Sequence, residues 1–253
     1  MTDVSVSNVS LVLAFGLVVL AIGISAKEKL GLGRDIAIAV LRTVLQLIVV
    51  GFVLQYIFQT NHLFLTVAMV MIIIVNASRQ AHSRNPSPSK SFWHSWLALL
   101  VATGLTLGIL LLSGAIKPIP SQVVPISGMI ASNAMIAIGL SYKALNHLFT
   151  DQRQQVLEKL ALGAPVKLAS LSIVRQAIKT GVQPTIDSAR TVGLVSLPGM
   201  MSGLIFAGVD PVHAIKYQIM VMFMLLAATS LGAVIASYFA YQTYFNEQMQ
   251  LEV

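Results

Sequence analysis

Long apolar runs separated by short polar segments dominate the pattern of this chain. A helix needs about 20 consecutive apolar residues to cross the hydrocarbon core of a bilayer. Suitable runs cover residues 9–26, 36–58, 62–77, 96–115, 122–142, 185–208 and 212–240. The pattern predicts an all-α, polytopic membrane protein with about seven transmembrane helices. Six or eight helices are the alternatives, because the third run is the shortest and its limits are poorly marked.

The placement of lysine and arginine predicts how these helices are oriented. Thirteen of the sixteen basic residues follow the first, third and fifth runs, whereas Lys117 and Lys216 lie on the opposite side and Arg42 lies inside the second run. Short cytoplasmic loops carry the excess of basic residues in membrane proteins. We therefore expect the N-terminus outside the cell and the odd-numbered loops in the cytoplasm.

Composition supports a single transmembrane domain over residues 1–253, which we expect in the inner (plasma) membrane. Hydrophobic residues make up 56% of the chain and charged residues 10%, against about 25% charged in an ordinary soluble domain. The net charge of +7 is explained by the loops between the apolar runs, so we expect no nucleic-acid partner. The absence of cysteine excludes disulfides and thiolate chemistry.

The segment 150–182 is the largest polar stretch and is expected in the cytoplasm, between spans five and six. Thr150 and Asp151 can open a first helix that Gly163 closes, and Pro165 suits the start of a second helix that Gly181 ends. The second helix carries an apolar stripe, which makes it amphipathic: Leu168, Leu171, Val174 and Ile178. One interpretation is a basic helix lying on membrane lipid; the other is a docking element for a cytoplasmic protein.

Docking is favoured by a resemblance within this segment. Residues 158–164, which read Glu-Lys-Leu-Ala-Leu-Gly-Ala, resemble the Glu…Gly-Ala loop with which membrane subunits of ABC transporters grip their ATPase. The residues assigned to this coupling surface are Glu158, Gly163, Arg175 and Lys179. No Gly-x-x-x-x-Gly-Lys-Ser/Thr motif occurs in the chain. ATP is therefore expected on a partner P-loop ATPase, and no cofactor on this chain.

A second resemblance extends over nearly the whole chain. Residues 184–220, together with 128–135 and 158–164 in the same order, closely resemble the FetB-type iron-export permease family, whose relatives include plant aluminium-tolerance permeases. The resemblance implies a permease that works as two copies with a separate cytosolic ATPase and exports iron. An organic or nucleotide-sugar substrate is the alternative. An enzyme is not expected, because the predicted spans contain no acidic residue at mid-depth.

Polar side chains deep in a membrane mark candidate functional sites. Asn133, beside Ser132, lies near the middle of the fifth run. Its side chain either forms an interhelical hydrogen bond or lines the substrate path. Pro198 lies near the centre of the sixth run and is expected to interrupt a helix there and free the carbonyl of Leu194. Ser196 strengthens this break. We predict that the substrate path passes these residues; a kink without function is the alternative at Pro198.

The metal ligands are not indicated by the sequence. Met200 and Met201 follow the break expected at Pro198. They either pack in the core or line the path with thioethers that bind a metal weakly. Thioethers favour Cu(I), whereas iron prefers oxygen and imidazole ligands. Arg42 is expected either to reach the cytoplasmic interface with its long side chain or to pair with Asp187. Asp187 itself is expected to cap the start of the sixth helix.

Overall fold

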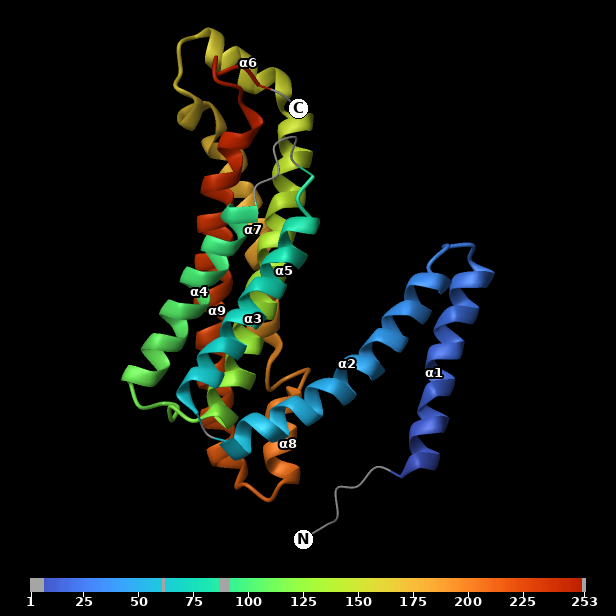
Figure 1. The fold of residues 1–253 in the computed structure, drawn as a ribbon. Coiled ribbons are helices and arrows are strands. Elements are labelled where there is room, and N and C mark those ends of the chain that lie inside the picture. The colour runs from blue at the N-terminus through green and yellow to red at the C-terminus, as the bar shows by residue number, and fades with distance from the viewer. Residues whose placement is uncertain (1–6, 61, 87–91, 252–253) are drawn as a thin grey trace.

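The computed structural model describes residues 7–60, 62–86 and 92–251, and within these residues the fold is helical throughout, without a β-strand (Figure 1). The all-α prediction is therefore confirmed. The helices in chain order are α1 (Asn8–Lys27), α2 (Gly33–Thr60), α3 (Leu63–Ser83), α4 (Phe92–Leu112), α5 (Pro120–Asp151), α6 (Arg153–Ala161), α7 (Val166–Thr191), α8 (Gly199–Phe206), α9 (Pro211–Ala240) and the 3₁₀ turn η1 (Tyr241–Tyr244).

Six helices in the described part of the chain are long and apolar enough to cross a membrane: α1 to α5, and α9 together with η1. The multi-pass membrane architecture predicted from hydropathy is thereby supported. Helix α5 has 32 residues and is about 48 Å long at 1.5 Å per residue. Because the hydrocarbon core is about 30 Å thick, part of α5 extends beyond the membrane and carries α6 at its end.

The core of the molecule is a bundle in which α5 packs against α3, α4, α7 and α9. Small residues permit this close packing, as is usual between membrane helices: Ala98, Ala102, Ala131, Ala134, Ala177 and Ala236 are all buried. The tightest position is Gly181 on α7, where an added Cβ would lie 2.6 Å from the carbonyl oxygen of Ala137 on α5 and even closer to the Ser141 hydroxyl. Glycine is required there by space.

Helices α1 and α2 form a hairpin that diverges from this bundle (Figure 1). Most of their apolar side chains are exposed, and Ile57, near the end of α2 that meets the bundle, is the buried residue of that helix. Two glycine pairs with a four-residue spacing, 104/108 and 199/203, likewise have open space where a Cβ would be. Lipid or another protein must cover these surfaces.

The sixth predicted span does not form a continuous helix, and this prediction is wrong. Helix α7 continues to Thr191, a turn follows, and α8 has eight residues, or about 12 Å, too short to cross a bilayer. In the turn, Gly193 has φ +85° and its N–H donates to the Ser196 carbonyl at 3.0 Å. Pro198 is the N-cap of α8 and does not interrupt a helix.

The segment 150–182 also differs from its prediction at several points. Thr150 and Asp151 end α5 and do not open a helix, because α5 is longer than its apolar run. Gly163, with φ +85°, follows the end of α6 as predicted, and Pro165 precedes α7. Helix α7 runs on through Gly181, which packs against α5.

The buried face of α7 is shifted from the predicted apolar stripe. Val174 is buried and Ile178 is half-buried, but Leu168 is 59% exposed. The residues that pack against α5 and α9 are instead mostly small: Ala169, Ser170, Ile173, Val174, Ala177, Gly181 and Val182. Much of α7 therefore belongs to the bundle, and not to a separate layer on the membrane surface.

Candidate functional site

A cavity of about 470 Å³ lies where α5, α7, α8 and α9 meet, beside the turn that joins α7 to α8. Its polar lining consists of amides and hydroxyls: Asn133, Thr185, Ser188, Ser196 and Gln218. The rest of the lining is apolar and includes Met129, Met200 and Met222. No charged side chain is among these lining residues. Such a site suits weak binding of a dehydrated ion or of a small polar molecule.

Four of the residues predicted for the substrate path line this cavity: Asn133, Ser196, Pro198 and Met200. Asn133 is half-buried on α5, and its amide nitrogen donates to the Met129 carbonyl at 2.9 Å. This bond is made within one helix, so the interhelical bond considered from sequence is not formed. The amide oxygen of Asn133 accepts no hydrogen bond from the described residues and remains free for a ligand.

Two residues predicted for the path lie elsewhere. Ser132 is exposed, and its hydroxyl donates to the Met129 carbonyl at 3.1 Å. Met201 lines a neighbouring apolar cavity of about 500 Å³ together with Leu197 and Phe223. Neither side chain belongs to the lining of the polar cavity, so their assignment to the path has no geometric support.

Gln218 on α9 is a lining residue that the sequence reasoning missed. It is 5% exposed, and its Oε1 atom has no hydrogen-bond partner among the described residues. A buried, unsatisfied amide oxygen costs free energy, and it is expected where a ligand supplies the missing partner. The signal was present in the sequence, because Gln218 is an amide inside the apolar run 212–240.

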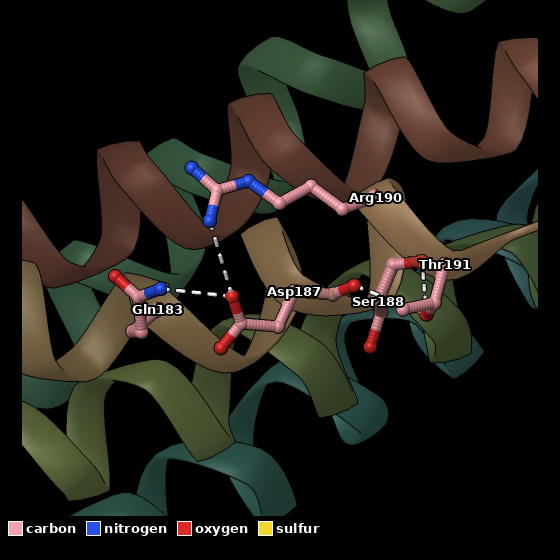
Figure 2. Close-up of polar contacts among 5 residues, drawn as sticks. All are labelled: Gln183, Asp187, Ser188, Arg190 and Thr191. Carbon is pink, nitrogen blue, oxygen red and sulfur yellow. Dashed lines mark hydrogen bonds and ion pairs between the residues drawn. The ribbon is translucent and has the colours of Figure 1, made fainter.

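A polar cluster lies in the last turns of α7 (Figure 2), next to Ser188, which lines the cavity. The Oδ1 atom of Asp187 accepts a hydrogen bond from Gln183 at 2.8 Å and lies 3.7 Å from the guanidinium of Arg190. Asp187 was predicted to cap the start of a helix, and this is wrong, since it lies near the helix C-terminus. A carboxylate is electrostatically unfavourable there, and Arg190 compensates for it.

Of the predicted coupling residues, Glu158 lies in the last turn of α6, and Gly163 lies in the turn between α6 and α7. Glu158 is exposed, and its Oε1 atom accepts a hydrogen bond from Gln154 at 3.2 Å. Leu162, between them, is 88% exposed at the tip of the turn and was not singled out from the sequence. Arg175 and Lys179 lie further along the exposed side of α7, about 13 Å and 20 Å from its first residue. The structure therefore separates the four predicted residues into two groups.

The described residues contain no group of three or more histidine, aspartate or glutamate side chains that could hold a metal ion. A resident metal centre therefore has no support in this part of the chain. A transported ion would have to be bound by the neutral oxygens and thioethers of the cavity.

Comparisons with known proteins place the chain in a family. The family described as "Uncharacterised protein family (UPF0014)" matches residues 8–245. The chain is 53% identical over 253 residues to the Escherichia coli (strain K12) protein named "Probable iron export permease protein FetB", covering 100% of this chain and 98% of that protein. No solved structure matches the chain.

More distant relatives come from other bacteria and from plants. The chain is 34% identical to "UPF0014 membrane protein YjkA" of Bacillus subtilis (strain 168), covering 96% of this chain and 97% of that protein. It is 35% identical to "Protein ALUMINUM SENSITIVE 3" of Arabidopsis thaliana, covering 94% of this chain and 88% of that protein. These names describe membrane and transport proteins and not enzymes, in agreement with the sequence prediction. The family match and these full-length similarities show that the chain is a multi-pass membrane protein of the UPF0014 family.

Proposed function

We propose that this chain is the membrane-spanning subunit of an ABC-type exporter that moves iron out of the cell, driven by a separate ATPase. The observation that carries the proposal is the polar, uncharged cavity among α5, α7, α8 and α9. The name of the Escherichia coli relative supports iron as the substrate. Two copies of the chain, both in the inner membrane, would form one transporter.

The cavity suits transport better than storage of an ion. Dehydrating a divalent ion is costly, so a path must offer oxygen ligands that replace some of its water. The free oxygens of Asn133 and Gln218, with the hydroxyls of Ser188 and Ser196, can do so. Because none of these ligands is a carboxylate or an imidazole, the ion is not trapped in one tight site.

An organic or nucleotide-sugar substrate is the second candidate. A cavity of about 470 Å³ falls in the range of sites for small organic molecules, and its amides and hydroxyls could also bind sugar hydroxyls. Reconstituted complex supplied with Fe²⁺, other divalent metals and organic candidates would distinguish the two, since ATP should drive the movement of one class.

The proposed ATPase contact is the end of α6, with Glu158, and the turn between α6 and α7, with Leu162 and Gly163; all three residues are exposed. Helix α7 connects this turn directly to the cavity, because Thr185 and Ser188 on the same helix line it. Movement of the turn by a partner would therefore be transmitted along α7 to the candidate substrate site.

Co-purification tests this assignment. We expect Glu158→Ala and Gly163→Pro to lower recovery of the ATPase with the permease, while membrane insertion of the permease is unchanged. Gly163→Pro acts because proline cannot adopt the positive φ of this position. Unchanged recovery with both variants would contradict the coupling role and favour a lipid contact for α6.

A further inference from the structure

Helix α2 carries a polar face that none of the described residues covers. Asp35, Arg42 and Gln46 recur at spacings of seven and four, which places them on one side of the helix. All three are exposed, and Arg42 has no hydrogen-bond or ion-pair partner among the described residues. Polar groups on membrane helices are costly unless they face protein or water.

The side chains of this face cannot all find polar partners by extending to the membrane surface. Arg42 lies nine residues beyond Gly33, or about 13 Å along α2, and its long side chain could approach the interface. Gln46, one turn deeper, has no such reach. A protein surface that accepts both residues explains the face better than lipid does.

Helix α7 presents a second uncovered polar face. Lys179, Gln183 and Asp187, with Leu140 of α5, line an open groove of about 630 Å³. The Oδ1 atom of Asp187 is taken by Gln183 and Arg190, whereas its Oδ2 atom has no partner among the described residues (Figure 2). A carboxylate can accept hydrogen bonds at both oxygens, so Asp187 can bind a further guanidinium.

The two faces are complementary in charge when the helices run in the same direction, as they do in this fold (Figure 1). Along α2, acidic Asp35 precedes basic Arg42 by seven residues; along α7, basic Lys179 precedes acidic Asp187 by eight. These separations are about 10 Å and 12 Å. In parallel register each charge meets its opposite, whereas an antiparallel contact would place like charges together.

The depths of the two faces also agree. Ser188, next to Asp187, lines the same cavity as Asn133, which is ten residues, or about 15 Å, before the basic Lys143 on α5. Arg42 lies about 13 Å into α2 from the end that carries Arg34. Asp187 and Arg42 therefore lie at similar distances, along the helix axes, from the basic residues Lys143 and Arg34, respectively.

We propose that α2 of one copy lies in the α7 groove of a second copy, with Arg42 bound to Asp187 and Asp35 bound to Lys179 across the contact. The hairpin diverges from its own bundle, and the contact of α2 with that bundle is near Ile57. A two-fold axis would form the contact twice. The inference rests on the proposed function in requiring two copies, and it assigns Lys179 to this contact in place of the ATPase contact.

Disulfide trapping in membranes tests the proposal, because the native chain has no cysteine. One tagged chain carries Ala39→Cys, one turn before Arg42, and a differently tagged chain carries Gln183→Cys, one turn before Asp187. After co-expression and oxidation, we expect a covalent dimer that bears both tags. Val44→Cys, which is 51% exposed but on the opposite side of α2, paired with Gln183→Cys, should give several-fold less.

Charge exchange provides a second readout. Arg42→Glu should lower the yield of the 39–183 dimer several-fold, and adding Asp187→Arg in the partner chain should restore it. Absence of the mixed dimer at normal insertion would overturn the proposal, as would a 39–183 disulfide formed within one chain that carries both cysteines. ATPase co-purification is scored on the same membranes, so loss of the ATPase alone would count against the proposed function and not against this contact.

Discussion

At the scale of single residues, the cavity lining contains two amide side chains, Asn133 and Gln218, which differ in their hydrogen bonding. Asn133 uses its nitrogen within α5, and Gln218 is almost fully buried with an unsatisfied oxygen. Buried polar groups are usually hydrogen-bonded. Several described residues have a buried polar atom without a partner, and of these Gln218 is the one that lines the cavity. This arrangement is better explained by a ligand that passes through than by packing.

The variant Gln218→Leu tests whether this residue is needed for transport or for stability. Replacing an unsatisfied buried amide by an apolar side chain of similar size should leave stability unchanged or raise it slightly. Loss of one ligand oxygen should lower transport by about three- to tenfold, equivalent to one hydrogen bond. Thermal unfolding in detergent and transport assays measure the two effects. A fall in stability matched by the fall in transport would indicate a structural role.

Gly181→Ala tests the contact between α7 and α5. An added Cβ would lie 2.6 Å from the Ala137 carbonyl oxygen, so we expect a loss of about 1–3 kcal/mol in stability. Gly104→Ala is the matched control, because nothing lies within 4 Å of its Cβ position. Equal midpoints of thermal unfolding for both variants would contradict the close packing.

At the scale of elements, the turn between α6 and α7 presents an exposed apolar side chain at its tip. Leu162 is 88% exposed, and we expect it to enter a pocket of the ATPase. Leu162→Ser should weaken ATPase recovery without affecting permease insertion. Leu168→Ser is the control, since Leu168 is 59% exposed on α7 beyond the turn. Equal recovery of the ATPase with both variants would show that Leu162 is not part of the contact.

The elements also show how far the sequence could predict the fold. Apolar length located α1 to α5 and α9, because each must satisfy the same membrane thickness. It failed at α7, whose buried face consists mostly of small residues and therefore carries a weak hydropathy signal. The run 185–208 has a suitable composition for a span, but the chain turns at Gly193 and Pro198 within it.

The candidate site was predicted in part. Asn133, Ser196 and Pro198 were predicted from the cost of polar or helix-breaking residues in apolar runs, and Met200 was predicted because it follows Pro198 closely. All four line the cavity. Thr185 and Ser188 were not predicted, because their places depend on the path of α7 beside α5. Gln218 met the same criterion as Asn133 and was overlooked.

At the scale of the whole molecule, the orientation in the membrane remains a prediction. The expected cytoplasmic end carries α6, and the expected outer end carries the start of α1. Cysteine at Ser7 should react with an impermeant thiol reagent in intact cells, whereas cysteine at Gln154 should not. Ser87, a second loop position suited to this test, lies outside the described residues. Labelling at Gln154 from outside would reverse the orientation.

The most direct test of the whole account is ATP-driven uptake of Fe²⁺ into inside-out vesicles that contain the permease and its ATPase. With the native chain, we predict accumulation that requires ATP. With Asn133→Leu and Gln218→Leu combined, accumulation should fall by at least tenfold while ATPase recovery and permease stability are kept. Full accumulation with the double variant would contradict the assignment of the cavity among α5, α7, α8 and α9 as the substrate path.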